Sequence, residues 1–433
     1  MTKIRKKDII KLLKNKEGLK MSILQGNAVV GQSGGPTAAI NATLAGVIRG
    51  AMDAKKKGII NNLFGMKNGI EGFLSEKLVN LSEFFASEDD LKTLELTPAA
   101  ALGSCRKKMK SPEDDPETYE HLIEIFKKYD IRYFFYIGGN DSMDTVSKLS
   151  KYAADHEYEL RVIGVPKTID NDLMVTDHTP GFGSAAKYVA ITVKEILCDI
   201  SVYTTKAVTI VEIMGRDAGW LTASASLAKL SGGVGPDLIY LPECDFDSGK
   251  FLEDVTEIQK DHPAVLVAVS EGIKFSDGRY VGEGLGGRKI DAFGHVALSG
   301  AGKVLEQLVK EKIGCKVRSI ELNLPQRCAA HIASSTDISE SVCVGSAAVE
   351  AAVNGKTGVM MTINRADFAE YSVYYDSADI SSIANGVKPV PREYINAEGN
   401  GITEECVAYL APLIQGEVAP VYENGLPKHI VIP

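Results

Sequence analysis

A six-residue segment, Lys167–Asp172 with the sequence KTIDND, places a cation, a hydroxyl and two carboxylates close together. Phosphoryl transfer uses this set of groups, because it needs charge neutralisation, positioning and a base that orients the attacking hydroxyl. The same composition also fits an Asx-rich turn that caps a helix. Taken alone, the segment leaves both interpretations open.

Two glycine-rich turns follow apolar segments in the same way as KTIDND does. They are Gly31–Gly35, with the sequence GQSGG, and Gly138–Ser142, with the sequence GGNDS. Glycines at such positions let backbone N–H groups approach an anion, and the N-terminus of a following helix adds a favourable dipole. A single turn of this kind is more often only a tight turn. Two of them with acidic residues nearby favour a phosphate and Mg²⁺ site.

Further cations and a glutamate occur at similar positions along the chain. Arg106 is followed by two lysines, Arg216 lies in a turn after an apolar segment, Glu271 follows another, and Arg318 and Arg327 flank the segment ELNLPQ. Arginine binds phosphate in a bidentate manner, and a glutamate accepts hydrogen bonds from sugar hydroxyls. One arginine alone is usually part of a surface ion pair. Several at the ends of strands favour binding of a phosphorylated sugar.

The elements that must position these residues alternate between short apolar segments and helical patterns. This alternation predicts an α/β protein with doubly wound, mostly parallel sheets, in which ligands bind beyond the carboxyl ends of the strands. Buried parallel strands are predicted at Ala28–Val30, Tyr133–Ile137, Arg161–Val165, Ala207–Met214, Leu238–Leu241 and Val265–Val269. Helices are predicted at Ala38–Lys56, Pro116–Lys128, Asp144–Asp155 and Ala185–Asp199, and a short amphipathic one within Lys3–Lys14.

Length and composition limit the class of protein. A chain of 433 residues predicts two domains, and 45% hydrophobic with 24% charged residues is typical of a globular protein. The net charge of −9 argues against nucleic-acid and anionic-membrane partners. The seven scattered cysteines form no metal-binding spacing and favour a reducing compartment. Because the sequence shows neither a signal peptide nor an apolar segment long enough to span a bilayer, we expect a cytoplasmic enzyme.

Taken as a set, the motifs between Ala28 and Ser346 resemble those of the phosphofructokinase family in their order and spacing. The resemblance implies two similar α/β domains with the active site in the cleft between them, and a sugar phosphate bound in part by a neighbouring subunit. We therefore expect an N-terminal extension over 1–21, a phosphate-donor domain over 22–183 and 326–366, a sugar-phosphate domain over 184–325, and a C-terminal appendage over 367–433 that packs on both domains. The expected assembly is a homodimer or homotetramer.

The resemblance also implies roles for individual residues. Asp170 would take the proton from the 1-hydroxyl of the sugar, and Asn140 and Asp170 would hold Mg²⁺. The residues expected to be catalytic are Asp170, Arg216 and Lys167. The donor-binding residues would be Gly34, Gly35, Arg106, Gly139, Asp141, Ser142 and Lys167. The substrate-binding residues would be Thr168, Asp172, Met214, Gly215, Arg216, Glu271, Arg318 and Arg327.

Three positions differ from the pattern of family members that use ATP. Asp141 and Lys167 both replace glycines of that pattern, and the resemblance implies that this pair marks the use of pyrophosphate. A carboxylate at position 141 would repel and crowd the α-phosphate of a nucleotide, while an ammonium at position 167 suits a compact donor of high charge density. Asn140 replaces an aspartate, so it keeps a neutral oxygen ligand for the metal and loses a charge.

The function implied is reversible phosphorylation of fructose 6-phosphate by pyrophosphate, giving fructose 1,6-bisphosphate and phosphate in glycolysis. An ATP-dependent 6-phosphofructokinase and a pyrophosphate-dependent kinase of another sugar phosphate, such as sedoheptulose 7-phosphate, remain as alternatives. A non-catalytic regulatory subunit is a fourth hypothesis. It is disfavoured because the base and the phosphate-binding side chains (Asp170, Arg216, Glu271 and Arg318) are all present.

Overall fold

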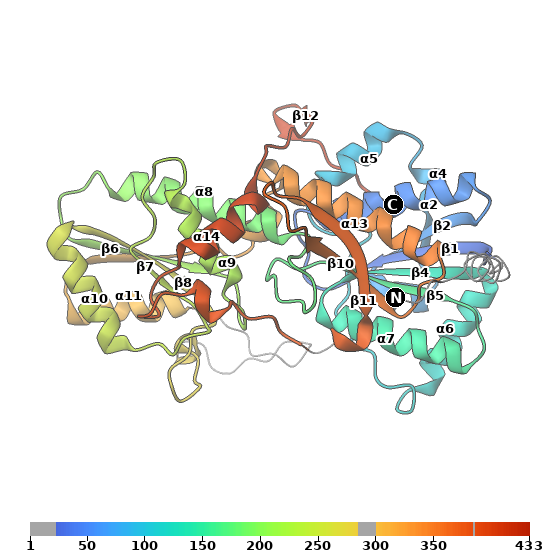
Figure 1. The fold of residues 1–433 in the computed structure, drawn as a ribbon, viewed down its shortest axis with the longest axis horizontal. Helices are drawn as coiled ribbons and strands as arrows, with labels where there is room; N and C mark the ends of the chain where they lie inside the picture. The colour runs from blue at the N-terminus through green and yellow to red at the C-terminus, as the bar shows by residue number, and fades with distance from the viewer. Residues whose placement is uncertain (1–22, 285–299, 384–385) are drawn as a thin grey trace, which may run out of the picture.

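The computed structural model describes residues 23–284, 300–383 and 386–433. They form two lobes side by side, and each lobe is built on a mostly parallel sheet with helices on both faces (Figure 1). The predicted α/β fold with two similar lobes is therefore confirmed. The predicted N-terminal extension and its short helix lie outside the described residues.

The large lobe contains a seven-stranded sheet. Its order is β11-β10-β5-β4-β1-β2-β3, with parallel pairing from β10 to β2 and one antiparallel strand at each edge. Because β1 leads outward to β2 while β4 lies on its other side, the connections diverge between β1 and β4, which is where α/β sheets bind ligands. The strands are Gly26–Gln32 (β1), Ile60–Met66 (β2), Leu78–Asn80 (β3), Ile131–Gly138 (β4), Arg161–Pro166 (β5), Val359–Arg365 (β10) and Val373–Asp379 (β11).

Both faces of this sheet are covered, as its nearly continuous apolar strands require. Val30 contributes to the core shared with α2 and α13, whereas its neighbour Val29 contributes to the core on the opposite face, with α3, α6 and α7. Helices α4 and α5 lie near β2 and α2 at one end of the lobe (Figure 1). The helices are Ile40–Lys56 (α2), Gly69–Leu74 (α3), Leu81–Phe84 (α4), Glu88–Glu95 (α5), Pro116–Lys128 (α6), Asn140–Asp155 (α7) and Ser335–Val353 (α13).

The small lobe has four parallel strands in the order β7-β8-β6-β9. Helix α8 packs on one face and α10 and α11 on the other. The strands are Ala207–Ile213 (β6), Leu238–Tyr240 (β7), Ala264–Ser270 (β8) and Lys316–Glu321 (β9). The helical elements are Phe182–Ile200 (α8), Trp220–Ala223 (α9), Ser224–Lys229 (η1), Ser248–Asp261 (α10), Val281–Gly284 (η2), Ala301–Lys312 (α11), Pro325–Cys328 (α12) and Ala330–Ile332 (η3).

The last part of the chain runs along both lobes. After β11, Val390 and Leu410 enter the small-lobe core, and Ile432 enters a core of the large lobe. A hairpin of β12 and β13 projects beside the large lobe (Figure 1). The elements after β11 are Ile380–Ser382 (η4), Arg392–Tyr394 (η5), Glu404–Leu410 (α14), Ala411–Ile414 (η6), Tyr422–Glu423 (β12) and Leu426–Pro427 (β13).

Some boundaries differ from the sequence-based expectation. The helix predicted from Asp144 begins at Asn140, so Asn140 and Asp141 lie in the first turn of α7 and not in a loop. Gly138 permits this tight junction, because a Cβ atom there would lie 1.9 Å from Oγ of Ser142. The segment after Asp367, expected to be an appendage, begins with β11 as an edge strand of the large sheet. Among the described residues, no helix has the length and apolar character needed to cross a membrane.

Candidate active site

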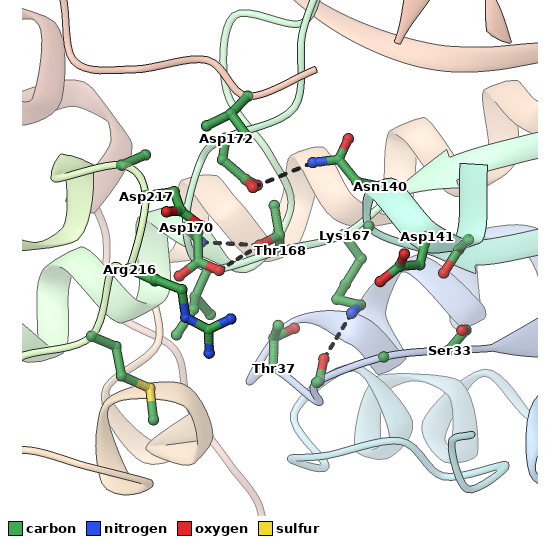
Figure 2. A pocket seen from close by; sticks show the side chains of 18 of the residues that line it. Ser33, Thr37, Asn140, Asp141, Lys167, Thr168, Asp170, Asp172, Arg216 and Asp217 are labelled. Carbon is green, nitrogen blue, oxygen red and sulfur yellow. Dashed lines mark hydrogen bonds between the residues drawn. The ribbon is translucent and has the colours of Figure 1, made fainter. Parts of the chain in front are cut away.

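The carboxyl ends of strands from both lobes open onto one cleft of about 470 Å³ (Figure 2). Loops after β1, β4 and β5 line it from the large lobe, and loops after β6 and β8 line it from the small lobe. A cleft of this volume lies within the range that holds small-molecule ligands. Its walls are rich in charged and polar groups, which favours an anionic, hydroxylated ligand over an apolar one.

The segment that follows β5 forms a closed loop at the base of the cleft. Thr168 and Gly181 pair in an isolated bridge, and the N–H of Thr168 donates to the carbonyl of Pro180 at 3.2 Å. Within the loop, the N–H of Asp170 donates to Oγ1 of Thr168 at 3.1 Å. Asp170 and Asp172 both line the cleft, and Figure 2 shows Asp170 beside Arg216 and Asp172 beside Asn140.

Burial dominates the electrostatics of this loop. It lowers the pKa of Lys167 to about 8, although the carboxylates of Asp170 and Asp172 act in the opposite direction. It raises the pKa of Asp170, against the effects of Lys167, the Thr168 hydroxyl and Arg216. It raises the pKa of Asp172 to about 7, and the charge of Asp170 adds to that shift. One ammonium and two carboxylates therefore share a poorly solvated site that favours mutual neutralisation.

The first glycine-rich turn lies against the Lys167 ammonium. Nζ of Lys167 donates to the carbonyl of Gly35 at 2.7 Å. Gly34 has φ +78°, a conformation that L side chains rarely adopt, and a Cβ atom there would lie 3.2 Å from the same Nζ. A Cβ atom at Gly35 would lie 3.4 Å from Nη1 of Arg327. The glycines thus bring backbone, Lys167 and Arg327 together, as a small anion would require.

The second glycine-rich turn carries the position expected to select the donor. Asp141 lines the cleft from the first turn of α7, where the helix dipole favours its negative charge. Oδ1 of Asp141 lies 3.8 Å from Nζ of Lys108, which also lines the cleft. Arg106 lines the same side, and its charge contributes, after burial, to lowering the pKa of Arg327. This side of the cleft therefore gathers cations around one carboxylate.

The small lobe supplies the opposite wall. The N–H of Gly215, whose φ is +135°, donates to Oε1 of Glu271 at 3.3 Å, and the N–H of Met214 donates to Oε1 of Gln326 at 3.2 Å. Burial raises the pKa of Glu271 to about 7. Nε of Arg216 is buried without a hydrogen-bond partner in the described protein, so an oxygen of a bound ligand would satisfy it. Figure 2 shows the Arg216 side chain beside Asp170.

The cleft brings together most of the residues singled out from the sequence, and two lie elsewhere. Gly215 does not line the cleft, although its N–H donates to Oε1 of Glu271, which does. Arg318 is exposed on the edge strand β9, outside the cleft of its own chain. The predicted residues that line the cleft are Gly34, Gly35, Arg106, Gly139, Asn140, Asp141, Ser142, Lys167, Thr168, Asp170, Asp172, Met214, Arg216, Glu271 and Arg327.

Sequence reasoning did not anticipate two groups of lining residues. Thr37 lies just after the first glycine pair, and its position before a predicted helix was the signal that could have drawn attention to it. Gly386 and Val387 reach the cleft from the C-terminal part of the chain. Nothing in their types or spacing indicates this, because a tertiary contact between distant segments brings them there.

The residues present fit a magnesium ion held together with a phosphorylated ligand. Oδ1 of Asn140 is buried without a hydrogen-bond partner among the residues that the structure describes, while its Nδ2 donates to Oδ2 of Asp172 at 3.4 Å. In the described part of the chain, no group of three or more His, Cys, Asp or Glu residues is placed to hold a metal. Magnesium usually takes one or two protein carboxylates, and phosphate oxygens and water complete its shell. The amide oxygen of Asn140, in a cleft that Asp170 and Asp172 also line, meets that need.

Comparison with known proteins identifies the family. A family model described as phosphofructokinase matches residues 27–352. The chain belongs to the phosphofructokinase family. This match includes every residue predicted to contact donor, sugar or metal, and it extends from the second residue of β1 to the last but one of α13. The glycine-rich turns, the loop after β5 and the small-lobe wall described above are thus parts of a phosphofructokinase domain.

Several relatives that resemble the chain over more than 90% of its length are named for the use of pyrophosphate. A pyrophosphate–fructose 6-phosphate 1-phosphotransferase of Halomonas elongata is 42% identical over 406 residues, which is 93% of this chain and 95% of that protein. The crystal structure of a pyrophosphate-dependent phosphofructokinase from Nitrosospira multiformis is 40% identical with a TM-score of 0.84, covering 94% of this chain and 98% of that one. A pyrophosphate-dependent phosphofructokinase from Marinobacter aquaeolei is 41% identical with a TM-score of 0.82, covering 93% and 95%.

Glu271 should make the stability of this phosphofructokinase depend on pH. Its folded-state pKa of about 7 exceeds the value of about 4.3 for an unfolded glutamate, so its contribution to stability is fully present below about pH 4 and is lost as the pH rises through about 7. Glu271→Gln removes this titration. Between pH 5 and pH 8, the free energy of unfolding of wild type should therefore fall by roughly 2–3 kcal/mol relative to that of Glu271→Gln.

Urea unfolding of both proteins at the two pH values measures this difference. Glu257→Gln is a suitable control, because the Glu257 side chain is 72% exposed on α10 and should give little change between the two conditions. An equal pH dependence in wild type and Glu271→Gln would contradict the assignment of a raised pKa to Glu271.

Proposed function

We propose that the protein catalyses the reversible transfer of a phosphoryl group from pyrophosphate to fructose 6-phosphate, giving fructose 1,6-bisphosphate and phosphate. The observation that carries this proposal is the joint presence of Asp141 and Lys167 in the cleft, beside the glycine turns. The names of the relatives support the same donor and the same sugar. We also propose that the reaction serves glycolysis in the cytoplasm, a compartment with which the seven unpaired cysteines are compatible.

In the proposed mechanism, the 1-hydroxyl oxygen of the sugar attacks the terminal phosphorus of pyrophosphate. The bond from that phosphorus to the bridging oxygen breaks, phosphate leaves, and the hydroxyl proton passes to Asp170. The raised pKa of Asp170 suits a base, because proton transfer is most efficient when the pKa of the base lies nearer the working pH. Arg216 and Lys167 would stabilise the charge that develops on the transferred group.

The two lobes would divide the substrates between them. Gly34, Gly35 and Arg106 would bind pyrophosphate, while Glu271 and Met214 would hold the sugar. Asn140 and Asp170 would hold Mg²⁺, and the bound ion would neutralise charge on the donor phosphates as a Lewis acid. Because Asn140 is neutral, most of the balancing charge for the metal must come from the donor itself, which a compact pyrophosphate supplies.

Asp170 should be essential for turnover and dispensable for folding. Removal of a general base typically lowers the rate by about two to four orders of magnitude, so Asp170→Ser should lose kcat by that factor. Its affinity for fructose 6-phosphate, measured by isothermal titration, should change little, because Arg216, Glu271 and Arg327 remain. Asp217→Ser is the matched control, since Asp217 lines the same cleft with a side chain that is 49% exposed. A near-normal kcat in Asp170→Ser would refute its assignment as the base.

Donor choice should depend on the charge of Asp141. Two unit charges about 4 Å apart repel by roughly 4 kcal/mol at an effective dielectric of 20, which corresponds to about three orders of magnitude in binding. Lys108 and solvent screen Asp141, so we expect a gain of one to three orders in kcat/KM for ATP in Asp141→Gly. Lys167→Gly should weaken the use of pyrophosphate, and the double variant should change the preference most.

The measurement is kcat/KM for both donors at matched Mg²⁺. Asp141→Asn separates charge from crowding, because it keeps the size of the side chain and removes the charge. A wild type that prefers ATP would refute the proposed donor. An ATP rate that is the same in wild type, Asp141→Gly and Asp141→Asn would show that position 141 does not select the donor.

We further propose that the active enzyme is a homodimer or homotetramer in which Arg318 binds the sugar phosphate of a neighbouring subunit. Its exposure on the edge strand β9, away from its own cleft, supports this role. Mixing the inactive variants Asp170→Ser and Arg318→Ala should then restore activity, because a hybrid dimer contains one complete site. Random exchange would give about a quarter of the wild-type activity. Mixtures no more active than the sum of their parents would exclude a shared site.

A further inference from the structure

The short segment 386–390, called here the C-terminal strap, comes from a distant part of the sequence and reaches the cleft. Gly386 and Val387 line the cleft, and the next residue, Lys388, turns away from it into the protein. None of the groups assigned above to donor, sugar or metal belongs to this segment. Its contacts nevertheless converge on the loop after β5, which carries Asp170 and Asp172.

That loop has an unusual backbone. Asn171 and Val175 have φ values of +54° and +68°, in the left-handed region that a β-branched residue such as Val175 rarely adopts. Conformations of this kind persist only where the surrounding structure holds them. The bridge between Thr168 and Gly181 closes the base of the loop, and contacts from other segments hold the part beyond it, among them the hydrogen bond from the N–H of Asp177 to the carbonyl of Ile363 at 2.9 Å.

Lys388 contacts both limbs of the loop. Its backbone N–H donates to the carbonyl of Asp172 at 2.8 Å. Its ammonium donates to the carbonyls of Thr176 at 3.1 Å and Asp177 at 2.6 Å. The backbone of Lys388 thus holds the first half of the loop, at Asp172, and its side chain holds the second half, at Thr176 and Asp177. The positive charge also acts on the carboxylates of Asp177 and Asp172.

The same strap is attached to the small lobe. Nε1 of Trp220 donates to the carbonyl of Lys388 at 2.9 Å, and the Lys388 ammonium lies 5.2 Å from the centre of an indole ring face, within range of a cation–π contact. Oε1 of Glu243 accepts from the N–H groups of Gly219 and Val390, both at 2.8 Å. Trp220 and Gly219 directly follow the segment that contains Arg216. The strap therefore connects the loop with Asp170 to the loop with Arg216.

We propose that Lys388 is a positioning residue for phosphoryl transfer, which fixes the loop after β5 relative to the Arg216 loop across the two lobes. The expected effect on kcat rests on the proposed function, whereas the expected effect on the loop rests on the hydrogen bonds alone. In-line transfer needs the base, the hydroxyl and the phosphorus in register, and a displacement of about 1 Å costs about a hundredfold in rate. A lysine that bonds two limbs of a strained loop and the opposite lobe supplies that register.

The alternative is a purely structural role, in which Lys388 only attaches the C-terminal part of the chain to the rest of the protein. Lys187 offers a matched comparison for it. This buried lysine on α8 donates its ammonium to the carbonyl of Gly416, so it also fastens the C-terminal region, but it makes no contact with residues 168–177 among its described hydrogen bonds and ion pairs. Lys388→Met and Lys187→Met each remove one such ammonium and keep most of the side-chain volume.

The experiment compares the two variants with wild type by steady-state kinetics and by amide hydrogen exchange. We expect kcat of Lys388→Met to fall by about ten- to a hundredfold while KM for fructose 6-phosphate changes by less than about threefold, because the small lobe still binds the sugar. Exchange of the amides in 168–178 should accelerate in Lys388→Met. Lys187→Met should keep kcat and the exchange of that segment near wild type, even if both variants unfold at similarly lower temperatures.

Unchanged exchange of 168–178 in Lys388→Met overturns the proposal, and so does faster exchange with an unchanged kcat. An equal loss of kcat in Lys187→Met would assign the effect to general fastening of the C-terminal region. If the wild-type protein fails to convert fructose 6-phosphate with pyrophosphate, the proposed function falls. The exchange of 168–178 in the two variants still decides whether Lys388 holds the loop.

Discussion

The structure depends on keeping an ammonium and two carboxylates together where water is scarce. Each of Lys167, Asp170 and Asp172 would be costly to bury alone. Burial lowers the pKa of Lys167 and raises the pKa of Asp170 and Asp172, so it favours the uncharged form of each. They are tolerated because they neutralise one another and because backbone groups hold them in fixed places. The glycine turn beneath Lys167, the closed loop after β5 and the strap across the lobes are the parts of the fold that hold these three groups.

Neither lobe alone contains all the groups of the proposed reaction. The large lobe places the loop after β5 against two glycine turns at the point where the strand connections diverge, and the small lobe faces it with Arg216 and Glu271. The distance between Asp170, the proposed base, and Arg216, the proposed phosphate ligand, therefore depends on how the two lobes are joined. Contacts far from any ligand, such as those of Trp220 and Glu243 with the strap, belong to the active site in this sense.

The sequence predicts most of the central sheet strands and of the cleft, and its failures have physical causes. Strands such as Tyr133–Ile137 are buried on both faces, so they are continuously apolar and easily recognised. β9 lies at an edge with partly exposed side chains, and β2 contains two asparagines, so neither shows that pattern. α7 begins at Asn140, at a tight junction that Gly138 permits and that helix propensities do not predict. Lys388 was missed because only the folded chain brings it to the loop.

The order of strands in the large sheet has a consequence for the way the protein is made. β10 and β11 complete that sheet and α13 completes its cover, yet they are encoded after all four strands of the small-lobe sheet. A nascent chain can therefore close the small parallel sheet once residue 321 has emerged, while the large sheet keeps β5 as an open edge until β10 is complete at residue 365, and β10 as one until β11 is complete at residue 379. Exposed strand edges invite pairing with other chains. The large sheet begins first and is completed after the small one, so it is the sheet that exposes strand edges for longer during synthesis.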